Sequence, residues 1–364
     1  MPHLASPLHI VCVSTPVGAL GSGLGGGVEL TLANLVSVLQ QQGQRVTVVA
    51  PAGSVLPGVE LIQVAGVLQP IAQNQDRHAP ITLPVGNVLS RMWQVVQAQP
   101  WDLAINLAYD WLPLYLTPFF DRPVLHLISM GSLLDYLDEV LAQVCATAPQ
   151  RVAMHSRAQA MTFGETIAQQ VTILGNGLDL RQYEFCPDPQ PVLGWVGRIA
   201  PEKGLPDALA VARQTGYPLR IMGKIADPDY WQDICRQFPE APHYYQGFLS
   251  THELQKRLGS CLALLVTPHW VEAFGNVVME ALACGVPVLS YALGGPAELV
   301  RAGETGWLVP PGDVAGLAAA VAQVGQIDRR RCRQVAEQEF SLTAWGERVA
   351  TWLRRNQSAA AGDA

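Results

Sequence analysis

Two basic side chains lie close together around a predicted turn in the second half of the chain. Arg198 follows the apolar run 192–196, and Lys203 comes five residues later, where a helical pattern begins. A guanidinium can bind phosphate through two parallel hydrogen bonds, an ammonium adds a point charge, and a helix N-terminus attracts anions. This spacing favours a diphosphate site, although ordinary surface charge is the simpler interpretation of an isolated pair. The chain has only three lysines, which are Lys203, Lys224 and Lys256.

Two acidic residues follow another predicted strand. Glu272 lies in the loop after residues 262–267, and Glu280 lies eight positions later in a helical pattern, so both side chains can face one cleft. Carboxylates accept hydrogen bonds from vicinal hydroxyl groups, and the N–H groups at the start of a helix suit sugar or phosphate oxygens. We therefore predict a sugar or nucleotide site, although a solvated helix acid is the simpler interpretation of Glu280. The N–H groups belong to Phe274, Gly275, Asn276 and Val277.

A glycine-rich loop follows the first predicted strand. Residues 21–26 match the pattern G-x-G-x-x-G of dinucleotide-binding folds. Six residues separate this pattern from the strand that it should follow directly, and Ala50-Pro51 stand where an acid should hold a ribose. These departures argue against a nicotinamide-dependent dehydrogenase. The loop that contains Gly26 and Gly27 still suits the close approach of an anion or a sugar, and a flexible lid without contacts is the alternative.

Short β-branched runs alternate with longer helical patterns, which is typical of parallel sheets covered by helices on both faces. We expect an α/β protein with two Rossmann-like domains, residues 1–183 and 192–340, joined by the proline-rich linker 184–191. Residues 341–364 predict a helix, whose two tryptophans we expect to pack on the first domain, and then a small polar tail. The expected strands are residues 9–14, 45–50, 103–107, 124–128, 151–155, 171–174, 192–196, 219–222, 262–267 and 286–290.

Composition limits the function further. The 23 basic residues are outnumbered by 30 acidic ones, and a formal net charge of −7 argues against nucleic-acid binding, which needs a dense basic surface. No apolar run approaches the ~18 residues that span a bilayer, so we expect no stable membrane insertion. The seven cysteines and eight histidines are scattered, without the spacing of metal ligands. The N-terminus has no secretory signal pattern, and we expect reduced cysteines and a cytoplasmic protein.

Taken together, the motifs resemble those of the retaining glycosyltransferases of family 4. This resemblance implies the GT-B fold of two Rossmann-like domains facing a central cleft, a nucleotide-sugar donor held mainly by the second domain, an acceptor held by the first, and no essential metal. The first half agrees more loosely than the second. The matching segments are Gly25-Gly26-Gly27-Val28-Glu29, the strand with His126, Asn176-Gly177-Leu178-Asp179, Gly197-Arg198 with Lys203-Gly204, the E-x7-E pattern from Glu272 to Glu280, Gly285-Val286-Pro287-Val288, Gly294-Gly295-Pro296-Ala297-Glu298, and Thr305-Gly306-Trp307-Leu308-Val309-Pro310-Pro311-Gly312-Asp313.

The resemblance also implies roles for individual residues. Arg198 and Lys203 would stabilise the departing diphosphate, and Glu280 would hold the ribose hydroxyl groups. Glu272 would hold the donor sugar together with the N–H groups of residues 274–277. His126 would lie against the transferred sugar, with a core histidine as the alternative. Further donor contacts would fall on Gly26, Gly27, Gly197, Gly223, Lys224, Phe248 and Leu249.

Residues 13–32 are similar to the cyanobacterial glucosyltransferases that modify tetrahydrobiopterin from UDP-glucose. This similarity implies transfer of glucose to a pterin, a small-molecule acceptor, with an α-glycoside as the product. The loop 106–111 suits a flat heterocycle, because an aromatic ring can stack on it and an acid can accept its amino protons, although a packed loop with Trp111 in an apolar gap is the alternative. The expected acceptor-binding residues are Glu29, Tyr109, Asp110 and Trp111.

Other acceptors and another class of protein stay open. A sugar or a lipid-linked sugar is the alternative acceptor. A nucleotide-sugar-binding protein without transferase activity, or an epimerase on the same fold, is the alternative class. Intact Arg198, Lys203, Glu272 and Glu280 argue against an inactive protein, and the sequence offers no additional acid and base for epimerisation. The family's mechanism is a front-face attack in which the leaving phosphate helps to deprotonate the acceptor, so a dedicated carboxylate nucleophile is not required.

Overall fold

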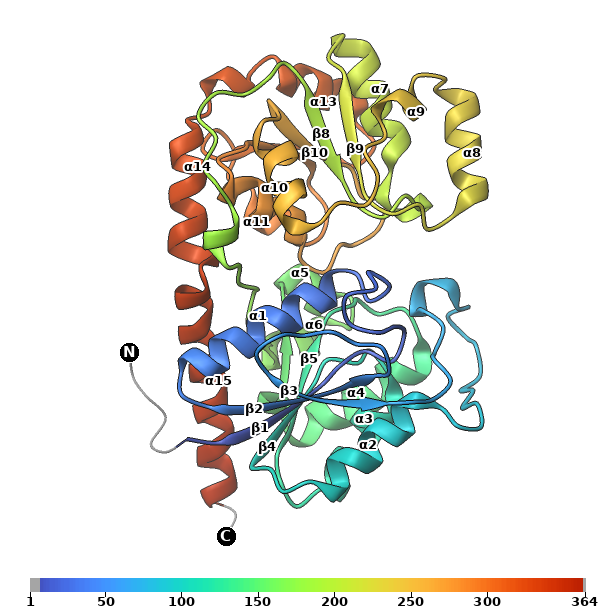
Figure 1. The fold of residues 1–364 in the computed structure, drawn as a ribbon, viewed down its shortest axis with the longest axis vertical. Helices are drawn as coiled ribbons and strands as arrows, with labels where there is room; N and C mark the ends of the chain where they lie inside the picture. Colours follow the sequence, from blue (N-terminus) through green and yellow to red (C-terminus); the bar gives the residue numbers. More distant parts are fainter. Residues whose placement is uncertain (1–6, 363–364) are drawn as a thin grey trace. The chain divides into compact units, whose positions relative to one another are not determined.

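The structure, a computed structural model, describes residues 7–362 and divides them into two compact units (Figure 1). The N-terminal unit runs up to Gly177 and also includes the chain from Leu342 onward. The C-terminal unit spans Leu178–Ser341. The first boundary thus precedes residues 184–191, the expected linker, and these residues lie inside the C-terminal unit.

The N-terminal unit contains a parallel sheet of seven strands in the order β3-β2-β1-β4-β5-β6-β7. Its strands are β1 (His9–Val13), β2 (Arg45–Pro51), β3 (Glu60–Val64), β4 (Leu103–Asn106), β5 (Val124–Ile128), β6 (Val152–Met154) and β7 (Thr172–Ile173). The helices of this unit are α1 (Gly27–Gln41), α2 (Val88–Ala98), α3 (Trp111–Leu116), α4 (Asp135–Thr147), α5 (Arg157–Met161), α6 (Glu165–Gln170) and α15 (Leu342–Gly362).

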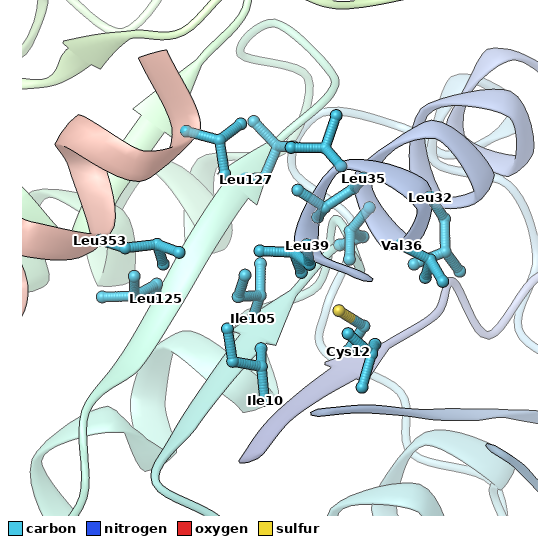
Figure 2. Packing of buried hydrophobic residues seen from close by; sticks show 14 of the residues in the cluster. Ile10, Cys12, Leu32, Leu35, Val36, Leu39, Ile105, Leu125, Leu127 and Leu353 are labelled. Carbon is cyan, nitrogen blue, oxygen red and sulfur yellow. The ribbon is translucent and has the colours of Figure 1, made fainter. Parts of the chain in front are cut away.

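Helix α1 packs on one face of this sheet through a stripe of apolar residues with helical spacing. Leu32, Leu35 and Leu39 are fully or almost fully buried. They recur at intervals of three and four residues, which places them on one side of the helix. Figure 2 shows these side chains beside Ile10 and Ile105 of the sheet, and the five residues belong to one apolar cluster. Burial of this stripe therefore fixes the start of α1, and with it the glycine loop that precedes the helix.

Helix α15 contributes to the same apolar cluster. Trp345 and Trp352 are completely buried in it, and the indole Nε1–H of Trp352 donates a hydrogen bond to the carbonyl of Gln150 at 2.8 Å. Gly177 lies directly under Trp345, because a Cβ atom at this position would approach the indole within 2.6 Å. The last helix of the chain thus completes the core of the N-terminal unit.

The C-terminal unit has a parallel sheet of five strands in the order β12-β11-β10-β8-β9. Its strands are β8 (Leu193–Val196), β9 (Leu219–Met222), β10 (Ala263–Val266), β11 (Val288–Tyr291) and β12 (Gly306–Val309). Its helices are α7 (Leu205–Thr215), α8 (Pro228–Gln237), α9 (Ala241–Tyr244), α10 (Thr251–Gly259), α11 (Asn276–Ala283), α12 (Gly295–Leu299), α13 (Val314–Val321) and α14 (Arg329–Val335).

Each sheet has one point at which the strand order reverses direction. In the N-terminal sheet the reversal lies between β1 and β4, and in the C-terminal sheet it lies between β8 and β10. The two connections that leave such a point run to opposite faces of the sheet, so a crevice opens at the carboxyl ends of these strands. The two reversals therefore mark where each unit can hold a ligand.

The sequence predicted the α/β class, the parallel sheets and ten of the strands, within a few residues at their ends. It missed β3 and β12, which are both at the edge of a sheet. Strand β3 is mostly exposed or half-buried and lacks the apolar run of a central strand. Strand β12 has only four residues and stops directly before two prolines. Such edge strands give a weak apolar signal.

We predict that α15 stabilises the N-terminal unit. Replacement Trp352→Ala should lower its free energy of unfolding by about 3–5 kcal/mol, because it empties a large buried volume and removes the hydrogen bond to Gln150. Urea denaturation of the full chain measures this change. The matched control is Arg355→Ala at an exposed position of the same helix, for which a change within about 0.5 kcal/mol is expected. Equal effects of the two substitutions would contradict the packing of α15.

Candidate functional site

The predicted lysine and acid meet at the strand reversal of the C-terminal unit. The Nζ atom of Lys203, in the loop after β8, makes an ion pair and a hydrogen bond with Oε2 of Glu272, in the loop after β10. The indole Nε1–H of Trp270 donates to the same carboxylate oxygen at 3.1 Å, and the Lys203 ammonium lies 5.1 Å from the centre of the indole ring. Both charged side chains are about one-fifth exposed, so a small ligand can reach them.

Arg198 has a carboxylate partner of its own in the same loop. Its Nη2 donates to Oε1 of Glu202 at 2.9 Å, and both side chains are only slightly more exposed than the lysine pair. A guanidinium carries five N–H donors, so one such bond leaves capacity for phosphate oxygens. Both cations predicted to bind a diphosphate are thus held by the chain's own carboxylates, with which such a ligand would have to compete.

Glycine is required where the loops around this ion pair pass each other. Gly204 has a φ of +62°, and a Cβ atom there would lie 2.0 Å from the carbonyl oxygen of Thr267. Gly294 has a φ of +67°, and its Cβ would lie 2.5 Å from the backbone of Glu272. The next N–H group, that of Gly295, donates to the carbonyl of Glu272 at 2.7 Å. The loops after β8, β10 and β11 are therefore in direct backbone contact.

Glu280 is buried within α11, and only 7% of its surface is exposed. Its Oε1 accepts a hydrogen bond from the hydroxyl of Tyr183 at 2.9 Å. Burial raises the pKa of the Glu280 carboxyl to about 7, and the bond from Tyr183 acts in the opposite direction. This carboxyl therefore titrates near neutral pH. Nothing in the sequence singles out Tyr183, because its nearness to α11 depends on the tertiary fold.

The loops after β8 and β9 also come together. The N–H of Gly223 donates to the carbonyl of Gly247 at 2.9 Å, and the carbonyl of Lys224 accepts the N–H of Ile199 at 2.8 Å. Phe248 and Leu249 directly follow Gly247 in the sequence; Phe248 is largely exposed, and Leu249 is half-buried. The two backbone bonds bring the expected donor contacts Gly223 and Lys224 beside the loop after β8.

The N-terminus of α11 lies at the same edge. The helix begins at Asn276, and Gly275 before it has a φ of +92°. Phe274 is buried and packs edge-on against Phe340. Asn276 and Val277 are the first residues of the helix, a position at which backbone N–H groups bond outside the helical ladder. Residues 274–277 thus lie at the start of a helix, and their contact with a donor sugar stays a prediction.

In the N-terminal unit, Glu29 fills the glycine loop. Its carboxylate accepts hydrogen bonds from the N–H groups of Gly21 at 2.7 Å, Gly23 at 3.3 Å and Gly25 at 2.8 Å. The loop therefore does bind an anion, but in this structure that anion is a side chain of the same chain. This differs from the acceptor contact expected of Glu29. Gly26 and Gly27 form the junction with α1, and Gly26 has a φ of +57°.

His126 lies in the core and not at a surface that a sugar can reach. It is fully buried on β5, and both ring nitrogens have partners. Nε2 lies 2.8 Å from the hydroxyl of Thr117, which itself donates to the carbonyl of Pro113, so Nε2 carries the proton. Nδ1 lies 3.2 Å from the amide nitrogen of Asn106. Burial lowers the pKa of His126 to about 3, which keeps the ring neutral. The structure thus corrects the expected sugar contact to a core histidine.

The other expected acceptor residues lie after β4, at the strand reversal of this unit. Asp110 caps α3 by accepting the N–H of Leu112 at 3.0 Å, and burial raises its pKa to about 6. The hydroxyl of Tyr109 donates to the carbonyl of Gly131 at 2.8 Å. Trp111 is half-buried, and its ring lies 5.8 Å from that of Tyr115. Asp110 and Tyr109 therefore have structural roles, and Trp111 offers a partly exposed ring.

The sequence analysis missed a long segment that crosses this edge. Residues 65–87 connect β3 to α2 with a single short 3-10 turn. They form hydrogen bonds with residues that come after three strands of the sheet. Gln69 bonds to Pro16 after β1 and to Asp110 after β4. Gln73 and Arg77 bond to residues after β5. We call residues 65–87 the strap. Long irregular connections of this kind are commonly functional, and the strap crosses the edge where an acceptor is expected.

Two further observations concern the described residues as a whole. Within residues 7–362, no three His, Cys, Asp or Glu side chains are grouped so that they could hold a metal ion. Over the same part of the chain, none of the helices has both the length and the apolar character needed to cross a membrane.

Comparison with known proteins identifies the class. Residues 179–339 match the family described as glycosyl transferases group 1. The chain is 29% identical to the glycogen synthase of Mycobacterium tuberculosis over 374 aligned positions, which cover 90% of this chain and 89% of that protein. It superposes on the sucrose-phosphate synthase of Thermosynechococcus elongatus with a TM-score of 0.76 at 19% identity, covering 96% and 99% of the two chains. It also superposes on Anabaena HepE bound to UDP-glucose with a TM-score of 0.73 at 18% identity, covering 96% and 100%.

The fold and these matches define a glycosyltransferase with the GT-B fold, which transfers a sugar from a nucleotide sugar. The family match covers most of the C-terminal unit, in which the predicted donor residues lie. The solved structures, all below 25% identity, support the fold alone.

We predict that Gly204 is needed for the junction of the loops after β8 and β10. Replacement Gly204→Ala should lower the free energy of unfolding by about 1–3 kcal/mol more than Gly216→Ala, because a Cβ atom would collide with the Thr267 carbonyl. Gly216 has a similar φ of +75° with no atom within 4 Å of its Cβ, so it isolates the cost of the backbone conformation. Urea denaturation of both variants tests this difference, and equal losses would refute the predicted collision.

Proposed function

We propose that this chain is a retaining hexosyltransferase that moves glucose from UDP-glucose to a hydroxyl group of a sugar acceptor and forms an α-glycoside. The observation that carries the donor side is the ion pair of Lys203 with Glu272, which joins the loops after β8 and β10 in the unit that also carries Arg198 and Glu280. The acceptor side is supported by the glycogen synthase, a relative that aligns with nine-tenths of the chain. A lipid-linked sugar belongs to the same acceptor class.

A pterin is the second candidate acceptor. The observation that favours it is the half-buried ring of Trp111 next to the buried carboxylate of Asp110, at the strand reversal of the N-terminal unit. Such a pair suits a flat heterocycle with amino groups. The sugar acceptor takes precedence, because Asp110 already caps α3 and receives the side chain of Gln69.

In this proposal the cations act on the leaving group. Arg198 and Lys203 bind the diphosphate and stabilise the negative charge that develops as the bond to the sugar breaks. Glu272 holds the donor sugar together with the N–H groups at the start of α11, and Glu280 holds the ribose. The leaving phosphate takes the proton of the acceptor hydroxyl on the face from which it departs. Catalysis then consists of positioning and charge stabilisation, without a carboxylate nucleophile or a metal.

The setting of the reaction is also part of the proposal. We place the enzyme in the cytoplasm, where thiols stay reduced, because all seven cysteines are free thiols and five of them are buried. The nucleotide sugar and a small-molecule acceptor are the partners that we propose.

We predict that Lys203→Ala and Arg198→Ala lower kcat by about 10²–10³-fold, because each removes a charge that stabilises the leaving group. Both variants should stay folded at the assay temperature, and Lys203→Ala should lower the melting temperature by a few degrees, because it leaves the Glu272 carboxylate without its ionic partner. Lys256→Ala is the matched control, because this lysine is exposed on α10 and its ammonium forms a hydrogen bond with the exposed His252. Transfer rates near those of the wild type in both site variants would remove the assignment of the diphosphate site.

The acceptor is tested by product analysis. Radiolabelled UDP-glucose is incubated with the full chain and either short glucose oligosaccharides or reduced biopterin, and the products are separated by chromatography. We expect a labelled oligosaccharide. A labelled pterin in its place would establish the second candidate. Binding of the nucleotide sugar without any transferred label would favour a binding protein, and conversion of the donor sugar to its epimer would favour an epimerase.

A further inference from the structure

The buried contact between Tyr183 and Glu280 has no role in the function proposed so far. Tyr183 is 3% exposed, and its hydroxyl donates to Oε1 of Glu280 at 2.9 Å. Among the described residues, this is the one hydrogen-bond partner of the Glu280 side chain. A carboxylate offers about four lone-pair positions, so the bond leaves Oε2 and part of Oε1 for a ligand.

Tyr183 is held in place from the other end of α11. Arg333 on α14 donates from Nη1 to the carbonyl of Tyr183 at 2.7 Å and to the carbonyl of Ala283, at the end of α11, at 2.6 Å. One guanidinium thus ties the Tyr183 backbone to the helix that carries Glu280. The backbone of Tyr183 is therefore held by Arg333, and its hydroxyl is held by Glu280. These two contacts fix the orientation of the tyrosine ring.

We propose that Tyr183 is the positioning residue of the donor-ribose site, where its hydroxyl orients the Glu280 carboxylate so that the free lone pairs accept both vicinal hydroxyl groups of the ribose. This inference rests on the proposed role of Glu280 in donor binding. Two ribose hydroxyl groups that both donate need an acceptor without a proton, and the ionised carboxylate is such an acceptor. A protonated carboxyl would present an O–H donor to one of them.

Two causes act on the pKa of Glu280: burial raises it, and the hydrogen bond from Tyr183 lowers it. Arg329 and Arg333 on α14 donate to backbone carbonyls, and Arg333 also pairs with Glu337. The titratable and charged groups on the elements packed against α11 are Cys284 at its end, His252, Glu253, Lys256 and Arg257 on α10, Tyr291 on β11, Glu298 on α12, Arg329, Arg330, Arg331, Cys332 and Arg333 on α14, and Glu337 and Glu339 in the segment that follows α14.

The direction of the pH dependence follows from this arrangement. Burial raises the pKa of Glu280 to about 7 in the protein without a ligand, and ribose binding needs the ionised form. Binding of the donor is therefore weak below pH 7 and strengthens as the pH rises through 7. Loss of the Tyr183 hydroxyl removes the bond that lowers this pKa, so the midpoint moves to higher pH.

Calorimetric titration of the full chain with UDP-glucose between pH 6 and 8 tests the proposal. UDP-glucose is a suitable probe because its diphosphate is a diester without an ionisation in this range. For the wild type we expect the binding constant to rise roughly tenfold between pH 6 and 8. The reason is that the ionised fraction of a group with a pKa of about 7 rises by the same factor over this range. Tyr183→Phe should weaken binding at pH 7 roughly tenfold, raise the midpoint and leave kcat at saturating donor within about twofold of the wild type.

Tyr291→Phe is the matched control. The Tyr291 hydroxyl also donates to a carboxylate of the same unit, Oδ2 of Asp207, at 2.6 Å, but that carboxylate is separate from Glu280. This variant should keep the wild-type pH midpoint. An unchanged midpoint and affinity in Tyr183→Phe, or the same shift in Tyr291→Phe, would overturn the proposal.

If Tyr183→Phe does not fold, a second ligand tests ribose binding by Glu280 in the wild type. The 2′,3′-dideoxy analogue of UDP-glucose lacks the groups that Glu280 is proposed to bind, so its binding to the wild type should lose the pH dependence. A persistent dependence would overturn the ribose assignment. Failure of the wild type to bind UDP-glucose at any pH, with binding of another nucleotide sugar such as GDP-mannose, would instead correct the donor of the proposed function, and the same pH test would then use that donor.

Discussion

The ion pair between Lys203 and Glu272 connects the loops on which the candidate donor site depends. Lys203 belongs to the loop after β8 and Glu272 to the loop after β10, and the backbone of Glu272 also binds Gly295 after β11. Both charges are largely removed from water, so either one alone would be an uncompensated charge in a poorly solvated place. The pair therefore fixes the spacing of three loops before any ligand arrives. In the proposed function, a diphosphate would then meet cations whose positions are already set, which would reduce the reorganisation needed on binding.

Much of the fold, and the positions of the candidate donor residues within it, was predictable from the sequence. Central strands such as β1 and β5 are short β-branched or apolar runs that are buried on both faces, and α1 has an apolar stripe at helical spacing. Arg198, Lys203, Glu272 and Glu280 were predictable because each lies within a few residues of a strand end or helix start. In parallel sheets these positions share one edge, so sequence order translates directly into spatial proximity.

The remaining features depend on contacts that spacing does not encode. Tyr183 meets Glu280 from a position 97 residues away, and Arg333 joins them from a third segment. His126 is one polar residue within the apolar run of a central strand. Only the burial of that strand on both faces shows that this histidine belongs to the core. Glu29 was selected for its position beside the glycines, but the fold of the loop turns its carboxylate onto them. The strap has few apolar residues in regular spacing, and its path follows from polar contacts with loops far away in sequence.

The N-terminal unit is made of two separated segments of the chain, with the whole C-terminal unit between them in sequence. On the ribosome, the second of these segments is therefore made after the C-terminal unit. Trp345 and Trp352 complete the apolar cluster of the N-terminal unit, but they are translated after all of residues 178–341. The stretch that forms the C-terminal unit is continuous, so this unit can fold as soon as it leaves the ribosome. The sheet face beneath α15 stays uncovered during that time, and it exposes apolar surface to other proteins. The apolar core of the N-terminal unit can therefore be completed only after Trp345 and Trp352 have been translated.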